Sequence, residues 1–393
     1  MVGGTVHSGL NTMDFGWSAD QVAFRAAVVD FASRALRDDL IARDRESRFN
    51  HEHWRRCGEF GIQGLPFPEQ YGGGGMDILT TILAMEALGY ACPDNGLLFG
   101  LAAQMWSVQM PIFRFGTEAQ KQAWLPRLNS GEWVGAHGMS EPDSGSDAFA
   151  LRTTAVPDGD HYLLNGTKTF VSEAPAADLF VVFATLDRHK GALGLTAFVL
   201  EKGTPGFSVG KQIEKMGLRT SPMAELIFDN CRVPAANRLG REGRAVQIFN
   251  DSMEWERGCI LASNIGTMER LLETSARYVK ERKQFGKPIG QFQSVANRLV
   301  DIKVRLEAAR LLLYKAAWAK QHDQNAGPDA AVAKLFLGEA MVQSCLDAVQ
   351  VRGGYGFTTE YEVERDLRDA VGGTLYSGTS EIQRNLIARS LGL

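Results

Sequence analysis

The sequence predicts an α+β fold, mainly α, in which a small β domain lies between two helical domains. Apolar residues recur at helical spacing from residue 18 to about 128, and short β-type runs separated by Gly, Asp, Asn and Pro follow from about 131 to 241. The helical spacing then returns in long segments. We therefore expect an N-terminal helical domain over residues 13–130, a central antiparallel β domain over residues 131–244 and a C-terminal helical bundle over residues 245–393.

The N-terminal part consists of helical stretches separated by turns. Segments such as "QVAFRAAVVDFASRAL" and "ILTTILAMEALGYA" have helical spacing, and "PFPEQYGGGG" and "CPDNG" punctuate them. Residues 1–12 are small and polar. We expect them to form a disordered extension and take Met13 as a candidate natural start.

The middle and C-terminal parts differ in period. Runs such as "DLFVVFATL" and "AELIFDNCRV" have the length and spacing of strands in a small antiparallel sandwich or barrel. After "EGRAVQIFN" we expect helices over about 246–282, 290–322 and 328–352, and a last helix from about Ser380.

Composition excludes several classes of function. The net charge of −4 is spread without a basic stripe, so neither nucleic acid nor an anionic membrane is an expected partner. The five cysteines are scattered without a CxxC pair or a nearby His at ligand spacing, so we expect no metal site. Free thiols in odd number predict a reducing, cytoplasmic location. No apolar run approaches the roughly 18 to 20 residues of a membrane span.

Two neighbouring segments carry residues suited to a flat ligand. "GMSEPDSGSDAF" concentrates hydroxyls and backbone amides around Gly145, although such composition is more often a surface turn. "NGTKTFVS" reads as a hairpin followed by a strand on which Phe170 and Ser172 point to the same side. These two side chains either bracket a heterocycle or belong to the core.

Two later segments carry residues suited to phosphates. In "RYVKERKQFGKPIGQFQ" a basic helix end breaks at Gly286, which indicates either a capped, solvated helix or a diphosphate contact made by Arg282 and Gln284. In "QVRGGYGFTTE" paired glycines follow a helix and would allow close approach to a nucleotide.

Six segments, in this order and spacing, resemble the acyl-CoA dehydrogenase family over essentially the whole length from Met13: "MSEPDSGSD", "NGTKTFVS", "MGLRTSP", "RKQFGKPIGQFQ", "QVRGGYGF" and "YSGTSEIQR". The resemblance implies the three-part fold described above and a homotetramer with one FAD per subunit. The flavin would lie between the β domain and the C-terminal bundle. The implied reaction removes a proton from the carbon α to a thioester and a hydride from the β carbon to the flavin N5.

The resemblance also implies the FAD contacts. Around the isoalloxazine ring it places Met139, Ser140, Phe170 and Ser172. Beside the FAD and the access path of the substrate it places Gly145 and Ser146. The segment that reaches the pyrophosphate and adenosine from across a subunit interface contains Arg282, Gln284, Phe285 and Gln293. Further nucleotide contacts are implied for Gln350, Gly353, Gly354, Thr379 and Glu381, although the family more often has Gln at the last of these positions.

The stretch "TLYSGTSEIQRN" lacks the family's usual catalytic base. The family carries Tyr-Glu-Gly-Thr there, and this chain has Ser377, whose hydroxyl is too weakly basic to take a proton from carbon. The family's alternative base directly precedes an Arg on the first long helix of the C-terminal bundle, a position that matches Glu256 before Arg257. The resemblance implies that Glu256 is the base and that the Ser377 backbone amide binds the thioester carbonyl.

Helical spacing independently singles out Glu256, because it falls on an otherwise apolar stripe formed by Phe249, Met253 and Ile260. A charge there is costly unless it is paired or functional, and burial would raise its pKa towards the range a base needs. Glu254 points to another face of the helix. In the alternative interpretation Glu256 pairs with Arg257 or Arg219 and only braces the bundle.

Several functions remain open. "SMEWERGCILAS" with "YSGTS" resembles the family branch of antibiotic and polyketide pathways, which oxidises acyl or aminoacyl groups on carrier proteins, including prolyl thioesters converted towards pyrrole. The first hypothesis is FAD-dependent dehydrogenation of such a thioester, on a carrier protein or on CoA, with an electron-transfer flavoprotein or O2 as acceptor. The small Ser377 favours a substrate substituted at the α carbon. The others are a flavin oxidase or monooxygenase on the same fold and a non-catalytic flavin-binding subunit.

Overall fold

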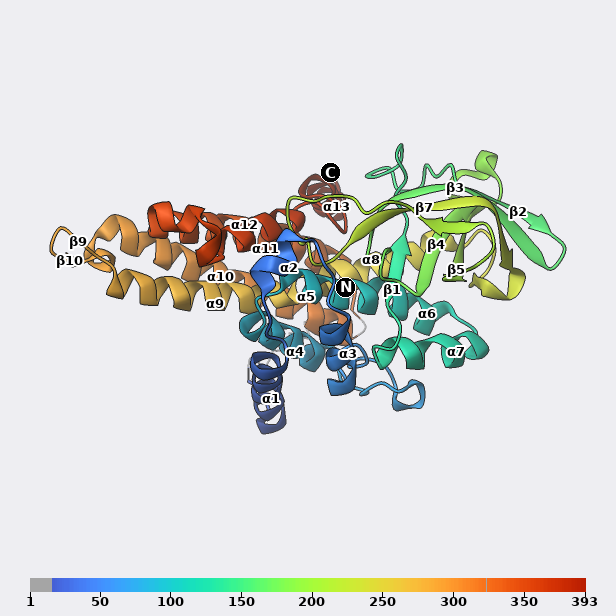
Figure 1. Cartoon of the computed structure of the whole chain (residues 1–393). Coiled ribbons are helices and arrows are strands. Elements are labelled where there is room, and N and C mark those ends of the chain that lie inside the picture. The colour runs from blue at the N-terminus through green and yellow to red at the C-terminus, as the bar shows by residue number, and fades with distance from the viewer. Residues whose placement is uncertain (1–15, 323) are drawn as a thin grey trace, which may run out of the picture.

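The computed structural model describes residues 16–322 and 324–393. Helices form the middle of the molecule, and the β domain lies at one end. The long helices α9 (Ala262–Glu281), α10 (Gln293–Gln321) and α11 (Gly327–Arg352) extend to the other end (Figure 1). The predicted extension over residues 1–12 and the candidate start at Met13 lie outside the described residues.

The N-terminal part is helical, as predicted. Its helices begin at polar caps, for example at Ser18, which forms a capping box with Gln21, and at Thr117, which forms one with Gln120. In chain order they are α1 Ala19–Ala35, α2 Leu40–Arg45, α3 His51–Phe60, η1 Glu69–Tyr71, α4 Ile78–Ala91, α5 Asn95–Ala103, the π-helical turn η2 Gln104–Gln109, α6 Met110–Phe115 and α7 Glu118–Asn129.

One helical stretch corrects the expectation about apolar length. Asn95–Phe115, which joins α5, η2 and α6, is long enough to span a membrane, and its most apolar window has a mean hydropathy of 1.2. However, 83% of its most apolar window is buried inside the protein. This is the pattern of a core helix in a large helical domain.

The central part is a sheet in the order β6-β7-β3-β2-β4-β5-β8, with β1 paired to β4. Most pairs are antiparallel, but β1 and β2 each run parallel to β4, so the sheet is mixed and not purely antiparallel as expected. The strands are β1 Gly135–Gly138, β2 Thr154–Asp158, β3 His161–Ser172, β4 Leu179–Thr185, β5 Leu195–Glu201, β6 Phe207–Val209, β7 Met223–Pro234 and β8 Arg238–Leu239, with the 3₁₀ turns η3 Arg188–Gly194 and η4 Ala235–Asn237.

The C-terminal part contains the elements α8 Ala245–Cys259, α9 Ala262–Glu281, β9 Lys283–Gln284, β10 Lys287–Pro288, η5 Ile289–Gln291, α10 Gln293–Gln321, α11 Gly327–Arg352, η6 Gly353–Phe357, η7 Thr359–Tyr361, α12 Val363–Gly372 and α13 Ser380–Ser390. The helix predicted over 246–282 is divided at Ile260 and Leu261. The sequence analysis missed α12, because in this short, charged helix only a few residues, such as Val363 and Ala370, are apolar and buried.

The N-terminal and C-terminal helices share one core through a close crossing of α4 and α9. A Cβ added to Gly89 would lie 1.7 Å from the Ser263 carbonyl oxygen, and one added to Gly266 would lie 1.9 Å from the Glu86 carbonyl oxygen. The two backbones therefore touch where each helix has a glycine. This contact fixes α4 against the helix that follows α8.

All five cysteines are buried free thiols, as expected. Burial raises the pKa of the Cys92, Cys231 and Cys259 thiols to about 12. Since a thiolate is the reactive form, these groups are inert packing residues.

Candidate active site around Glu256

The Glu256 carboxylate joins three segments that are distant in sequence. It lies on α8 and is 7% exposed. Its Oε2 accepts a hydrogen bond of 2.5 Å from the Ser107 hydroxyl on η2, and its Oε1 accepts one from the Ser377 hydroxyl in the turn before α13. The sequence analysis singled out Glu256 and Ser377 separately, and the structure brings them into contact.

The apolar stripe around Glu256 has the predicted character. Met253 and Ile260 are 5% and 2% exposed, while Glu254 turns away and pairs with Lys320 at 2.6 Å. Burial raises the pKa of Glu256, and the Ser107 and Ser377 hydroxyls oppose that shift in part by stabilising the charged form. A carboxylate with a raised pKa is a stronger base than one in water.

The bracing alternative for Glu256 is not what the structure shows. Within the described residues Glu256 forms no ion pair. The Arg257 Nε donates to the Ser377 carbonyl at 3.2 Å, and the Arg219 Nε donates to the Lys215 carbonyl at 3.0 Å. The partners of Glu256 are neutral hydroxyls.

The turn at Ser377 presents a backbone amide. Ser377 and Gly378 both have left-handed φ values, 57° and 87°. Their carbonyls accept hydrogen bonds from Gln383 Nε2 at 3.1 and 2.8 Å, and the Gly378 carbonyl also accepts one of 2.6 Å from Lys334 Nζ. These bonds fix the turn. The Ser377 N–H has no hydrogen-bond acceptor among the described residues and is available to a ligand.

Lys334 and Tyr376 complete the surroundings of the carboxylate. Burial lowers the pKa of Lys334 to about 8, against the opposing effect of Glu256, and burial raises the pKa of the Tyr376 phenol. The Tyr376 ring packs on the Phe99 ring, with 4.7 Å between the two ring centres. Lys334 was not among the predicted site residues, although a single lysine within the apolar run "AAVAKLFLG" is the same kind of signal that singled out Glu256.

The segments predicted to hold the flavin ring lie side by side. Met139 is buried and its carbonyl accepts a hydrogen bond of 3.2 Å from Lys168 Nζ, and the Ser140 carbonyl accepts one of 2.9 Å from the Thr169 amide. A register shift in the pairing of β3 with β7 precedes Val171, and Phe170 has φ 56° and a side chain that is 63% exposed. The strand irregularity thus presents an aromatic ring outside the core.

The residues predicted for the phosphates and adenosine lie elsewhere. Arg282 directly follows α9, and its guanidinium lies 5.6 Å from the centre of the Tyr355 ring. This contact brings the segment around Gly286 next to the segment that contains Gly353 and Gly354. The turn at β9 and β10, which contains Gln284, lies at the opposite end of the molecule from β2 to β5 (Figure 1), and next to it Phe285 is 92% exposed. The single chain does not bring this group to the flavin-ring group.

The remaining predicted contacts are divided between these regions. Gln293 begins α10, and Gln350 lies near the end of α11, before Gly353 with φ 58°. Thr379 caps α13 by accepting a hydrogen bond of 3.3 Å from the Ile382 amide, and Glu381 is exposed in its first turn. Gly145 and Ser146 are exposed in the loop after β1.

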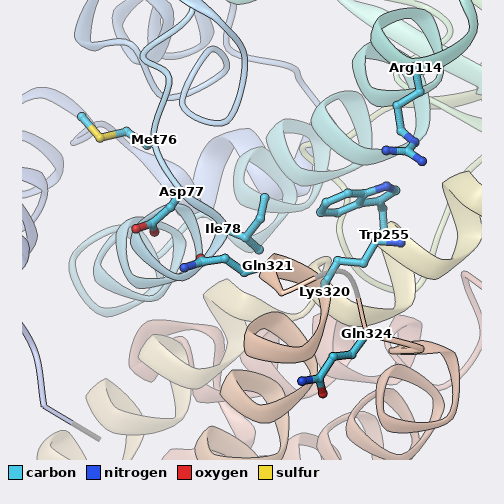
Figure 2. A pocket seen from close by; sticks show the side chains of 8 residues that line it. All are labelled: Met76, Asp77, Ile78, Arg114, Trp255, Lys320, Gln321 and Gln324. Atoms are coloured by element: carbon cyan, nitrogen blue, oxygen red, sulfur yellow. The ribbon is translucent and has the colours of Figure 1, made fainter. Parts of the chain in front are cut away.

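A cavity of about 460 Å³ lies beside α8 (Figure 2). Figure 2 shows Trp255 with Arg114 and Lys320 along it. The Lys320 ammonium lies 4.5 Å from the Trp255 ring, which stacks on Trp106 at 5.7 Å with an interplanar angle of 2°. Glu256 does not line this cavity. Within residues 16–322 and 324–393 no cluster of His, Cys, Asp and Glu is arranged to hold a metal ion.

The comparisons with known proteins cover nearly the whole chain. Family models described as the N-terminal, middle and C-terminal domains of acyl-CoA dehydrogenase match residues 18–132, 136–231 and 243–392. The chain belongs to the acyl-CoA dehydrogenase family. Membership makes it an FAD-dependent oxidoreductase of acyl thioesters, as the resemblance predicted.

Relatives of two kinds are similar to this family member. The chain is 41% identical to an L-prolyl-[peptidyl-carrier protein] dehydrogenase of Pseudomonas fluorescens, over 97% of this chain and 100% of that protein. It is 40% identical to a short-chain specific acyl-CoA dehydrogenase of Clostridium acetobutylicum, over 96% and 99%. Among solved structures, the prolyl acyl carrier protein oxidase AnaB superposes with a TM-score of 0.95 at 53% identity, over 96% and 100% of the two chains.

The residues of this acyl-CoA dehydrogenase suit FAD. Nothing lies within 4 Å of a Cβ added to Gly145, Gly353 or Gly354, so each leaves open space against which a ligand backbone or ring can pack. The exposed Phe170 offers an aromatic face next to the hydroxyl-bearing segment at Ser140. Neutral hydroxyl and amide donors of this kind fit a flavin ring.

Proposed function

We propose that this protein removes the α and β hydrogens of an aminoacyl thioester, and that its substrate is an L-prolyl group on a carrier protein, oxidised towards a pyrrolyl thioester. The identities of 41% and 40% to prolyl and short-chain enzymes do not discriminate between these substrates, whereas the 53% identity to a prolyl acyl carrier protein oxidase favours the prolyl group. The observation that carries the proposal is the contact between Glu256 on α8 and the small Ser377. It supplies a base while leaving room beside the α carbon for a ring.

In the proposed reaction Glu256 takes the α proton, and the unpartnered N–H of Ser377 donates to the thioester carbonyl, where negative charge develops. Bound FAD supplies the acceptor of the β hydride. Arg257, Lys334 and Gln383 donate hydrogen bonds to the carbonyls of residues 377 and 378 and so fix the turn that carries that N–H. Burial of Glu256 excludes water from the proton transfer.

Three further properties belong to this proposal. The β9–β10 turn, which contains Gln284, lies far from the β domain, and this supports a homotetramer in which Arg282, Gln284 and Phe285 complete the FAD site of a neighbouring subunit. We place the protein in the cytoplasm, consistent with its buried free thiols. The electron acceptor is an electron-transfer flavoprotein or O2. The similarity to a protein called an oxidase favours testing O2 first.

The test is anaerobic bleaching of the flavin's visible absorbance with matched thioesters, namely prolyl, butyryl and isovaleryl groups, each on a phosphopantetheinylated carrier protein and on CoA. The proposal expects prolyl on the carrier protein to bleach fastest. Faster bleaching by butyryl-CoA would overturn the substrate assignment. The rate of recolouring in air then separates an oxidase from a dehydrogenase that needs a protein acceptor.

A further inference from the structure

Each oxygen of the Glu256 carboxylate already accepts a hydrogen bond from a serine hydroxyl, and that bond makes the oxygen a weaker base, so an oxygen that loses its hydroxyl partner when substrate binds is favoured to take the proton. Ser107 holds Oε2 and Ser377 holds Oε1. The two hydroxyls are not equivalent, because they lie on different kinds of backbone and differ in exposure. The difference between the two hydroxyls therefore indicates which oxygen takes the proton.

Ser107 is fixed in the core. It is 2% exposed, and its neighbours Trp106 and Val108 are 0% and 1% exposed. Trp106 and Trp255 directly precede Ser107 and Glu256 in the chain, and their parallel stacked rings hold η2 against α8. A movement of the Ser107 backbone away from Glu256 would have to disturb this stack.

The π-helical turn explains how a serine reaches this place. Pro111 lies four residues after Ser107, so it cannot donate to the Ser107 carbonyl, and its ring would crowd that carbonyl in a regular α-helix. The chain widens instead to η2, where the Met110 amide bonds the Met105 carbonyl. Widened turns of this kind are frequent at functional sites.

Ser377 lies on the open side. It is partly exposed, it has a left-handed φ of 57°, and it belongs to the turn whose free N–H is assigned to the substrate carbonyl. A thioester bound to that N–H approaches the carboxylate from the Ser377 side. The hydroxyl that gives way is therefore that of Ser377.

We propose that Ser107 is a positioning residue that keeps its hydrogen bond to Oε2 throughout the reaction, and that Oε1, released by Ser377 when substrate binds, takes the α proton. The α C–H bond breaks and its proton forms the Oε1–H bond. The electron pair left on the α carbon, which the thioester carbonyl stabilises in the transition state, forms the α,β double bond as hydride leaves the β carbon, and bound FAD would accept that hydride. This inference rests on the proposed role of Glu256 as base.

The charged groups around Glu256 are common to all variants of the test. The charged groups are Arg257 on its own helix and Lys334 on α11, and the neutral Tyr376 phenol on the turn before α13 is a further titratable group. Ser107 stabilises the charged carboxylate, so its loss raises the pKa of the base. The pH at which the rate of proton removal reaches half of its maximum is then higher.

The experiment measures the single-turnover bleaching rate at saturating prolyl carrier protein against pH, in the wild type, Ser107→Ala, Ser107→Thr and Ser377→Ala. We expect Ser107→Ala to move the acidic limb of the pH–rate profile, where the rate rises with pH, to a higher pH by about one unit, because a hydrogen bond to a charged group has been lost. Ser107→Thr restores the hydroxyl and returns the limb towards the wild type. Ser377→Ala leaves the limb in place, since its hydroxyl no longer touches Oε1 in the complex.

A second readout does not involve hydride transfer. An acetyl thioester has no β carbon, so its exchange of α hydrogen for deuterium in D2O reports the base alone, and the same shift is expected for Ser107→Ala. An unmoved limb in Ser107→Ala, or equal shifts in Ser107→Ala and Ser377→Ala, would overturn the inference. Normal bleaching by Glu256→Gln would instead show that the proposed function itself is wrong.

Discussion

The Ser377 hydroxyl donates a hydrogen bond to Oε1 of Glu256, across 121 residues of sequence. The position where the family usually carries its catalytic glutamate thus touches the carboxylate that this chain carries on α8. The side chains of residues 256 and 377 meet at one point, so in the proposed function a base at either position would face the α carbon of the thioester. The choice between them determines how much room the substrate has beside that carbon.

This relationship predicts the behaviour of a relocated base. In Glu256→Gln combined with Ser377→Glu, we expect anaerobic bleaching with an unbranched butyryl thioester but a rate about a hundredfold or more lower with the prolyl thioester, because the new side chain fills the space of the ring. Comparable bleaching by both thioesters would contradict the role assigned to the small Ser377. Ser377→Glu alone is the control for disruption of the turn.

The buried pair of Lys168 and Glu141 supports the flavin-ring segment and gives a stability prediction. Lys168 Nζ bonds the Glu141 carboxylate at 2.8 Å and the Met139 carbonyl at 3.2 Å, and both side chains are almost wholly buried. Burial lowers the pKa of Lys168 to about 8, although Glu141 opposes that shift. Lys168→Met leaves the Glu141 carboxylate buried without its ion-pair partner, although the Arg152 and Thr153 amides still donate to it, and should lower the free energy of unfolding by about 3 to 5 kcal/mol.

Chemical denaturation measures that loss, and FAD content measures the effect on the flavin-ring segment. The matched control is Lys303→Met, which removes an exposed pair with Glu307 and should change stability by less than about 1 kcal/mol. Equal effects of the two substitutions would show that the buried pair does not support this segment.

The crossing of α4 and α9 predicts a steric effect. Gly89→Ala would place a Cβ 1.7 Å from the Ser263 carbonyl, so the two helices have to separate, at a cost of about 3 kcal/mol or more. The control is Gly327→Ala, where the added Cβ would lie 3.6 Å from the nearest atom, in ordinary van der Waals contact. Thermal unfolding of the two variants should differ clearly. Similar melting temperatures of the two variants would mean that α4 and α9 can separate without loss of stability.

Glu173 gives a pH prediction. It follows Ser172, is 1% exposed, and neither of its carboxylate oxygens has a hydrogen-bond partner among the described residues. Burial raises the pKa of Glu173 to about 8, with Lys215 opposing the shift. The unfolded chain loses this proton above pH 4.5, whereas the folded protein retains it until about pH 8, so stability from this group is lost as pH rises through that window.

Glu173→Gln removes that dependence. Its melting temperature should exceed that of the wild type by an amount that grows between pH 5 and pH 8, over roughly the interval separating the unfolded and folded pKa values. Exposed Glu132→Gln is the control and should show no such trend. A difference that is constant with pH would contradict a buried, protonated Glu173.

The sequence predicted what periodicity and local chemistry determine. Glu256 was recognised as a charge on an apolar stripe, and the alternation of helical and strand patterns gave the three-part fold. The sequence did not reveal Ser107, because a π-helical turn breaks the spacing on which such predictions depend. It also did not separate α8 from α9, since the apolar pattern continues through Ile260 and Leu261.

The measurement that tests the central claim most directly is anaerobic flavin bleaching by prolyl carrier protein in Glu256→Gln, with Glu254→Gln as control. Glu254 lies two residues away, on another face of α8, and pairs with Lys320. We predict that Glu256→Gln retains its FAD and loses roughly 10⁴-fold in bleaching rate, the upper range for removal of a general base, while Glu254→Gln stays close to the wild type. Wild-type bleaching by FAD-loaded Glu256→Gln would contradict the assignment of Glu256 as the base.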